Sequence, residues 1–225
     1  MAHAGQLTFD AAGNLFAVHR HSVSKFTANG TKTIVATGFQ SPIGLCVDSQ
    51  GNVFVSDFAS NSIFKIASDG KRSTFANGLS GEGMAFDRSN NLLVAHGDSV
   101  FKITPSGVKG TFASGVSNLS SPIDLALDGS GNLFLVPIRE LDGKPGISPS
   151  IIKFSPDRVR SLFASSLNEP RGISLDEAGN LFVTVETDEQ GTGYLRRAIL
   201  KFSPDGTNHI FASGLAIRSF GLAVG

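Results

Sequence analysis

Three side chains that can bind metal ions stand at equivalent positions of a repeated sequence pattern. They are His19, Asp57 and His96, each at the end of a short apolar run, with His21 close to the first. Imidazole nitrogen and carboxylate oxygen are common ligands of Zn²⁺ and other divalent ions. The hypothesis of a shared metal site competes with a simpler one, in which three separate polar residues stand on different structural repeats.

Two long insertions carry a second group of chemically useful side chains. They span residues 137–149 and 186–197 and include Arg139, Glu186 and Tyr194, the only tyrosine of the chain. Loops held by a rigid scaffold commonly carry recognition residues, so the two insertions could form one wall of a binding pocket. The alternative is a pair of solvated loops whose internal salt bridges contribute little to stability.

The elements that must position these residues come from a sequence repeated five times. A Gly-Asn pair, replaced by Asn-Asn in the third copy, begins at residues 13, 51, 90, 131 and 179. A recurring period of roughly 40 residues indicates a repeat architecture. A lysine also recurs in every copy, and we interpret it as a solvated charge on an outer strand that discourages edge pairing. These lysines are residues 25, 65, 102, 153 and 201.

Each copy contains four short runs of strand-forming residues separated by turn signals. In the second copy the runs are residues 43–48, 53–57, 63–67 and 73–76. None approaches the roughly 10–12 residues that favour a helix. Four hairpin-linked strands in about 40 residues are typical of a propeller blade, whereas the coils of a β-helix are usually shorter. We therefore predict an all-β fold, a β-propeller of four-stranded antiparallel blades.

The repeat boundaries predict a single propeller domain over residues 1–225. The expected blades are residues 5–40, 41–79, 80–118, 119–167 and 168–215. A further apolar run at 219–225 matches the first strand of a sixth blade. The chain is then either a segment of a six-bladed propeller or a five-bladed ring with a spare strand. An incomplete ring would expose unpaired strand edges, which favours self-association.

In three stretches the chain resembles the NHL-repeat propellers and the related senescence-marker-protein and gluconolactonase superfamily. The stretches are PIGLCVD at 42–48, GNVFVSD at 51–57 and ILKFSPDG at 199–206. The likeness extends over nearly the whole chain and implies a propeller, with six blades as the usual number. Asp57 and Asn61 match a turn of NHL repeats in which this spacing is structural. The resemblance does not imply one activity, because such propellers include hydrolases, lyases and binding modules.

The resemblance also implies where a divalent metal would bind, since enzymes of this superfamily hold one at the channel mouth with Glu, Asn and Asp ligands. The equivalent positions are Gly5, Ile43, Glu82, Ile123, Arg171 and Phe220. Only Glu82 is a metal-ligand residue, and Arg171 would repel a cation and is better explained as its ion-pair partner across the channel. Asp124 could supply a second carboxylate, or it could cap a turn.

The leading hypothesis is a non-catalytic scaffold that binds a small molecule or a protein at the channel mouth, near Glu82, Asp124, Arg171 and the two insertions. The alternative is a metal-dependent lactone hydrolase of the gluconolactonase type, with Ca²⁺, Zn²⁺ or Mn²⁺ at Glu82. A lyase acting on a cyclic ester or a sugar is a third possibility.

Composition excludes other classes. Acidic and basic residues number 19 each, and with one Tyr and no Trp the chain offers no basic aromatic surface for nucleic acid. No apolar run reaches the roughly 18 residues of a membrane span. The first residues lack the pattern of a signal peptide, and the compartment stays open. The single cysteine, Cys46, stands in an apolar run and is expected in the core.

Overall fold

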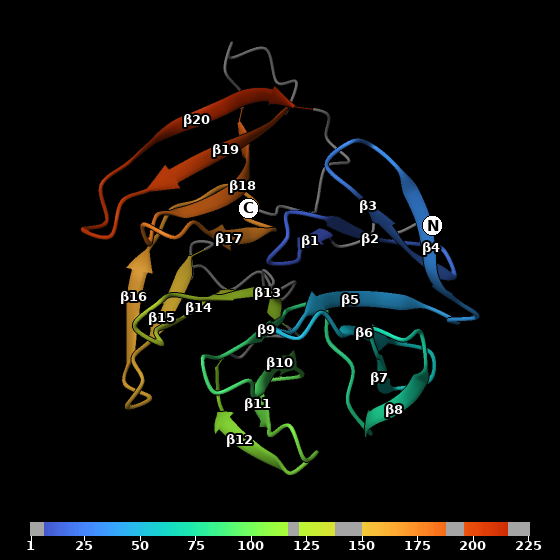
Figure 1. The fold of residues 1–225 in the computed structure, drawn as a ribbon. Coiled ribbons are helices and arrows are strands. Elements are labelled where there is room, and N and C mark those ends of the chain that lie inside the picture. The colour runs from blue at the N-terminus through green and yellow to red at the C-terminus, as the bar shows by residue number, and fades with distance from the viewer. Residues whose placement is uncertain (1–6, 117–121, 138–149, 188–195, 216–225) are drawn as a thin grey trace.

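The computed structural model describes residues 7–116, 122–137, 150–187 and 196–215. The regular elements of these residues are strands, which form five four-stranded antiparallel sheets. The sheets surround a common centre like the blades of a propeller (Figure 1). The predicted all-β propeller is therefore confirmed, with five blades. The additional strand predicted at 219–225 lies outside the described residues.

In every blade the four strands follow the chain from the centre to the rim, and we call them A, B, C and D in that order. Blade 1 contains β1 (Leu7–Phe9), β2 (Leu15–His19), β3 (Ser22–Phe26) and β4 (Lys32–Thr37). Blade 2 contains β5 (Pro42–Val47), β6 (Val53–Asp57), β7 (Ser62–Ile66) and β8 (Arg72–Asn77). Blade 3 contains β9 (Met84–Phe86), β10 (Leu92–His96), β11 (Ser99–Ile103) and β12 (Lys109–Ala113).

Blade 4 contains β13 (Pro122–Leu127), β14 (Leu133–Pro137), β15 (Ile151–Phe154) and β16 (Arg160–Ala164). Blade 5 contains β17 (Ile173–Leu175), β18 (Leu181–Thr187), β19 (Arg196–Phe202) and β20 (Asn208–Leu215). Because neighbouring strands are antiparallel, the A–B and C–D turns lie on one side of the ring, which we call the turn side. The B–C and D–A connections lie on the other side, which we call the mouth side.

The repeated Asp and Asn residues close the A–B turn of each blade. In blade 2, the Asp48 carboxylate accepts from the backbone N–H of Asn52 at 2.8 Å, and the Asn52 amide donates back to it at 2.7 Å. Gly51 adopts a φ of 79°, in the left-handed region that glycine enters without strain. The third copy has Asn90 there instead, with a φ of 60°, which asparagine tolerates better than other residues. The same turn therefore forms in all five copies.

Most of the core lies between blades, in four hydrophobic clusters. Each cluster joins two consecutive blades, and together they connect blades 1 to 5 in order. Cys46 belongs to the cluster between blades 2 and 3, as predicted, and burial raises the pKa of its thiol. Each sheet has too little apolar surface to form a core alone, so the blades stabilise one another.

The recurring lysines do not lie at an edge, contrary to our interpretation of them as solvated charges on an outer strand. They belong to strand C, and strand D forms the rim of each blade. In four blades the lysine ammonium lies over the ring of the phenylalanine opposite it on strand B, at 5.3 to 5.5 Å from the ring centroid. The aliphatic stem thereby covers an apolar ring while the charged end stays near solvent.

The described part of the chain contains no helix with the length and apolar character that a membrane span requires.

Candidate functional site

Three consecutive inner strands bring Glu82, Asp124 and the start of β17 together on the mouth side. The Asp124 carboxylate accepts from the N–H of Leu125 at 2.9 Å and, across to blade 5, from the N–H of Ile173 at 3.0 Å. Asp124 therefore links two blades instead of capping a turn. Glu82, which precedes β9 in blade 3, is close enough for its charge to act on Asp124.

Close backbone packing fixes the position of Glu82. The N–H of Gly81 donates to the Ser56 hydroxyl at 2.9 Å, and a Cβ atom at Gly81 would lie only 2.0 Å from the carbonyl oxygen of Ala95. On the other side, a Cβ atom at Gly83 would lie 3.0 Å from the Cα atom of Asp124. Glycine is required at both positions because the backbone approaches strand B of its own blade at Gly81 and strand A of the next blade at Gly83.

The environment of Asp124 makes it a titratable group near neutral pH. Burial raises the pKa of Asp124 to about 7, the two backbone N–H donors oppose this rise, and the Glu82 carboxylate adds to it. Two carboxylates side by side resist full ionisation because like charges repel at short range. At neutral pH the Glu82–Asp124 pair can therefore accept or release a proton, which is the chemistry of an acid–base site or of a ligand-dependent proton switch.

A second charged group lies beside this pair in blade 5 and contains two of the predicted residues, Arg171 and Glu186. The side chain of Arg197 is 2% exposed; it pairs with Glu186 at 2.9 Å and donates to the backbone oxygen of Glu169 at 3.0 Å. Arg171 pairs with the Glu169 carboxylate at 3.2 Å. This described ion pair of Arg171 lies within its own blade, and the predicted pair of Arg171 with Glu82 stays a prediction.

Arg197 and Glu169 were missed as site residues from the sequence. Arg197 lies at the end of a predicted insertion, which we interpreted either as a wall of a pocket or as a solvated loop, yet it belongs to β19 and is buried. Burial lowers the pKa of Arg197, Glu186 raises it and Arg171 lowers it. The useful signal was the local excess of charge in blade 5, because buried arginines require carboxylate or carbonyl partners.

Asp57 has a structural role on the mouth side. Its side chain is 1% exposed and accepts from the backbone N–H groups of Gln40 at 2.7 Å, Ser41 at 3.1 Å and Ser60 at 3.3 Å. These contacts join the D–A connection to the B–C turn of blade 2. The carboxylate is thus bound to the backbone, consistent with the structural spacing of Asp57 and Asn61 in NHL repeats.

The two histidines of the same predicted set lie in other blades. His19 is exposed, while the Nδ1 atom of His96 contacts the backbone oxygen of Ser80. Within the described ranges, no group of three His, Cys, Asp or Glu side chains is arranged to hold a metal ion. The metal hypothesis for His19, Asp57 and His96 therefore gains no support. Arg139 and Tyr194, two other predicted binding residues, lie outside the described residues.

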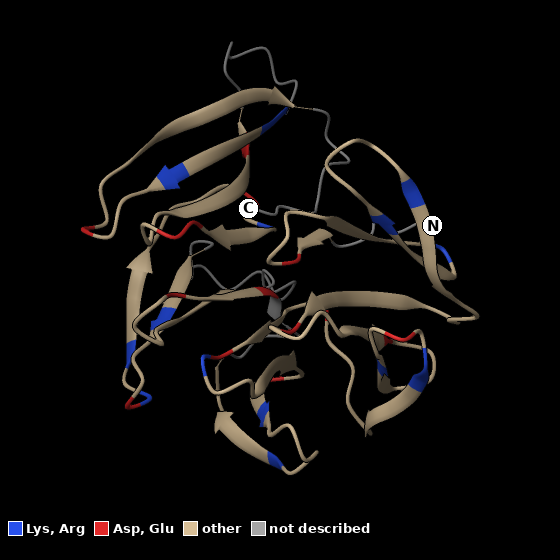
Figure 2. Ribbon diagram, in the orientation of Figure 1, with Lys and Arg blue, Asp and Glu red and all other residues tan. Residues whose placement is uncertain are grey.

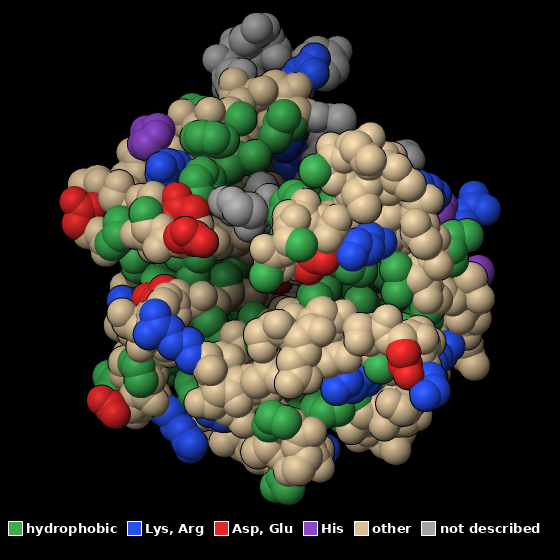
Figure 3. All heavy atoms as spheres, in the orientation of Figure 1, with side chains coloured by type: hydrophobic (Ala, Val, Ile, Leu, Met, Phe, Trp, Pro, Cys, Tyr) green, Lys and Arg blue, Asp and Glu red, His purple; other side chains and the backbone are tan. Residues whose placement is uncertain are grey.

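Charge is distributed evenly around the ring. Every blade carries both acidic and basic residues (Figure 2), and on the face drawn in Figure 3 the two signs are interspersed among apolar side chains. The buried charges of blade 5 are therefore a local feature and do not belong to a large surface field.

Residues 39–66 match the family model of the NHL repeat. Together with the gluconolactonase and regucalcin structures among the similar folds, this match confirms the predicted resemblance. The matched segment covers most of blade 2, including the Asp48–Asn52 turn and Asp57. A comparison with curated proteins gave no match.

Several solved structures share the fold. A chain from a nidogen/laminin complex is 17% identical, with a TM-score of 0.73 over 98% of this chain and 84% of that one. Regucalcin, a calcium-binding protein from Agrobacterium tumefaciens, is 16% identical, with a TM-score of 0.71 over 98% and 77%. Virginiamycin B lyase from Staphylococcus aureus is 14% identical, with a TM-score of 0.70 over 99% and 73%. At these identities the likeness shows the fold alone.

Proposed function

We propose that residues 1–225 form a single propeller domain that acts as a non-catalytic binding scaffold. Its ligand, a small polar molecule or a segment of another protein, would bind on the mouth side around Glu82, Asp124 and Arg171. The observation that carries this proposal is the charged network of blade 5, in which Arg171 and Arg197 are held by Glu169 and Glu186. Such a network provides rigid, preorganised polar groups for recognition.

The similar structures are compatible with both the binding scaffold and the enzymatic alternative. The nidogen/laminin complex is an assembly of proteins, which supports a protein-binding role for this type of propeller. Regucalcin is a calcium-binding protein, and a gluconolactonase from Xanthomonas campestris has a TM-score of 0.57 with this chain, which supports the enzymatic alternative. The choice therefore depends on the residues of this chain.

The metal-dependent lactone hydrolase is favoured by one observation, the adjacency of Glu82 and Asp124. Hard cations such as Ca²⁺ take six to eight oxygen ligands. Both oxygens of Asp124 already accept backbone N–H groups, and the described residues hold no group of three His, Cys, Asp or Glu side chains that could bind a metal ion. The described residues thus do not fit a complete metal site, which is why the scaffold is preferred.

One experiment separates the two functions. The full chain and its Glu82→Gln variant are titrated calorimetrically with CaCl₂, MnCl₂ and ZnCl₂, and then with glucono-1,5-lactone while hydrolysis is followed by pH. Lactone binding that Glu82→Gln weakens at least about tenfold, without turnover, is the result expected for a scaffold. Micromolar metal binding together with metal-dependent hydrolysis, both lost in the variant, would overturn the proposal in favour of the hydrolase.

We also propose that the ring associates with a second copy through blade 5. Phe211 on β20 is 58% exposed, whereas the equivalent Phe75 and Phe163 are half-buried against the next blade. Large exposed apolar side chains on an outer strand favour association. Sedimentation velocity should show concentration-dependent dimers that Phe211→Ser abolishes, and a monomer at all concentrations would contradict this proposal.

A further inference from the structure

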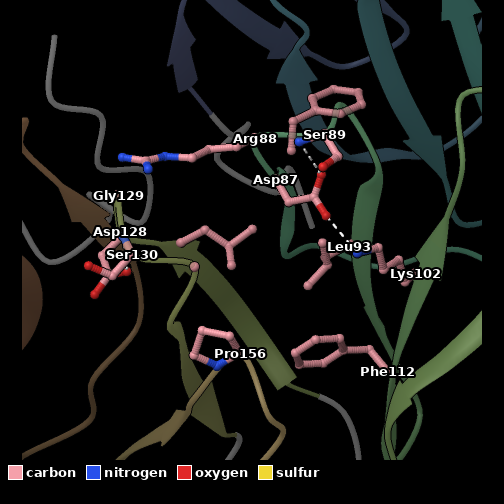
Figure 4. Close-up of a pocket in the computed structure, with 13 residues that line it drawn as sticks. Asp87, Arg88, Ser89, Leu93, Lys102, Phe112, Asp128, Gly129, Ser130 and Pro156 are labelled. Carbon is pink, nitrogen blue, oxygen red and sulfur yellow. Dashed lines mark hydrogen bonds and ion pairs between the residues drawn. The ribbon is translucent and has the colours of Figure 1, made fainter.

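A cavity of about 470 Å³ opens between blades 3 and 4 on the turn side of the ring. Its walls come from the A–B turns of both blades, from strands β10, β11 and β12, and from Pro156 in the C–D turn of blade 4 (Figure 4). The volume lies within the range of small-molecule sites. Since the Glu82–Asp124 pair lies on the mouth side, this cavity is separate from the site proposed above.

The cavity lies where the repeat departs from its own pattern. Strand B carries a phenylalanine opposite the recurring lysine in four blades, at Phe16, Phe54, Phe134 and Phe182. In blade 3 the residue opposite Lys102 is Leu93. One aromatic ring is therefore missing from the interface between blades 3 and 4.

The other blades show what the missing ring would contact. Phe54 meets Phe75 of strand D edge to face with a centroid distance of 4.9 Å, and Phe134 meets Phe163 in the same way at 5.0 Å. The equivalent ring in blade 3 is Phe112, and among the described residues it has no such aromatic partner. Phe112 lines the cavity together with Leu93. The space beside Phe112 therefore includes the place of the ring that blades 2 and 4 supply themselves.

The charged groups at the rim of the cavity differ in whether they already have a partner within the protein. Asp87 is neutralised by Lys102 at 2.8 Å, and the Asp128 carboxylate accepts from the N–H groups of Ser130 and Asn132, both at 2.8 Å. Arg88 is exposed and forms no ion pair with any described residue. Of the charged side chains that line the cavity, Arg88 is therefore the cation outside an ion pair, while Asp128 has hydrogen-bond donors but no described cationic partner and keeps its negative charge.

Arg88 reaches across the cavity from blade 3 to blade 4. A Cβ atom at Gly129 would lie only 2.9 Å from the Nη2 atom of Arg88, so a glycine at 129 leaves room for the guanidinium. In Figure 4 the Arg88 side chain extends along one side of the cavity, with Phe112 and Pro156 on the opposite side. A planar ring inside the cavity could therefore direct an acidic substituent to this guanidinium, which binds carboxylates in a bidentate manner.

We propose that this cavity binds a small monocyclic aromatic acid. The aromatic ring occupies the place that phenylalanine fills in blades 2 and 4 and packs edge to face on Phe112. The carboxylate pairs with Arg88 at the rim. The site requires both the leucine at 93 and the arginine at 88.

The test compares benzoate with benzyl alcohol, which has the ring without the charge, by calorimetry and ligand-observed NMR on the full chain. Both probes should bind the wild-type protein, benzoate more tightly. Leu93→Phe should weaken the binding of both probes because the new ring takes the place beside Phe112 that the ring of the probe would occupy. Arg88→Gln should weaken benzoate at least about tenfold and leave benzyl alcohol unchanged, whereas the matched Arg160→Gln variant on the rim of blade 4 should behave like wild type.

Three results would overturn the proposal. They are no binding of benzoate to the wild-type protein, equal binding to Leu93→Phe, and benzoate affinity that Arg88→Gln does not change. A titration of the wild-type protein tests the site even where Leu93→Phe fails to fold. In a benzoate titration of labelled wild-type protein, the amide signals of residues 129–131 should shift, and shifts confined to the mouth side would equally refute the site.

Discussion

The mouth side and the turn side are built by the same repeat, yet they are specialised in different ways. On the mouth side, blades 3 to 5 gain charged groups that are bound to backbone or to opposite charges, such as Asp124 and Arg197. On the turn side, the Asp–Asn turns are kept in all five blades, and the exception is an apolar position, Leu93. The mouth side thus differs between blades by added charged groups. The turn side differs by one missing aromatic ring, which leaves a cavity.

The largest expected loss of stability compares backbone packing on the mouth side with packing on the outer strand of a blade. Gly81→Ala would place a methyl group 2.0 Å from the Ala95 carbonyl oxygen, so we expect a loss of about 3 kcal/mol or more in the free energy of unfolding. Gly110→Ala on β12, where no atom lies within 4 Å, is the matched control and should be nearly neutral. Urea denaturation measures both, and equal stability of the two variants would contradict the packing argument.

Asp57 tests whether a mouth-side carboxylate can be structural only. Asp57→Ala leaves three backbone N–H groups without their acceptor in a buried site, so we expect a loss of roughly 3 kcal/mol in the free energy of unfolding. Asp69→Ala in an exposed C–D turn should cost far less. Thermal and urea unfolding with metal-free buffers and with added Zn²⁺ give the readout. Stabilisation of the wild type by Zn²⁺ that Asp57→Ala removes would instead restore the metal hypothesis.

The pH dependence of stability tests the Glu82–Asp124 pair. The pKa of Asp124 is about 7 in the folded protein and near 3.8 in the unfolded chain, so the folded state binds the proton more tightly. Stability should therefore be highest below pH 4 for this group and fall as pH rises through 7. Since Asp124 is half-buried, the loss should be roughly 2 kcal/mol.

Asp124→Asn should remove this fall in stability between pH 4 and 8. Glu82→Gln should move it to lower pH, because the neighbouring negative charge that raises the pKa of Asp124 is gone. Aspartates with lowered pKa values, such as Asp69 and Asp205, change stability in the opposite sense and mainly below pH 4. Identical pH profiles for wild type and Asp124→Asn would show that Asp124 does not titrate in this range.

The smallest expected changes in the free energy of unfolding come from the turn side. One substitution there should raise it and the other should lower it. Leu93→Phe should raise the free energy of unfolding by about 1 kcal/mol, because the new ring can pair with Phe112 as Phe54 pairs with Phe75. Phe54→Leu should lower it by at least about 1 kcal/mol, because the edge-to-face contact with Phe75 is lost and a small cavity is left between blades 2 and 3. Destabilisation by Leu93→Phe would show that the cavity cannot accept a ring, against the comparison of the blades.

The sequence predicted the architecture well because the architecture is made of repeated local signals. Asp48, Gly51 and Asn52 form a turn through contacts within five residues, and the same contacts recur in each copy. Cys46 was also placed correctly, since an apolar run in a strand is buried wherever sheets stack. The lysines were interpreted wrongly as edge charges, because the third predicted run of each copy was taken as an outer strand, whereas the fourth run forms the edge of each sheet.

The candidate site was only partly predictable. Glu82 and Asp124 were selected by aligning the repeats, and the structure brings them into electrostatic contact. The partners of Arg171 and Arg197 could not be inferred as a set, because Glu186 meets Arg197 through the pairing of β18 with β19, whereas Glu169 contacts both arginines from the connection before β17. The Leu93 cavity was missed for a different reason. A single Phe-to-Leu difference is conservative as a sequence change and is significant only where a neighbouring blade fails to fill the space.

By itself the sequence determined the number of strands in a blade, their order and the turns between them, because these depend on residues a few positions apart. The tertiary structure decided which side chains meet between blades: Asp124 with the backbone of Ile173, Arg197 with Glu186, and Arg88 with the space left at Gly129. Those contacts depend on how one sheet packs against the next, and that geometry is set by the volumes of all the side chains in the interface together.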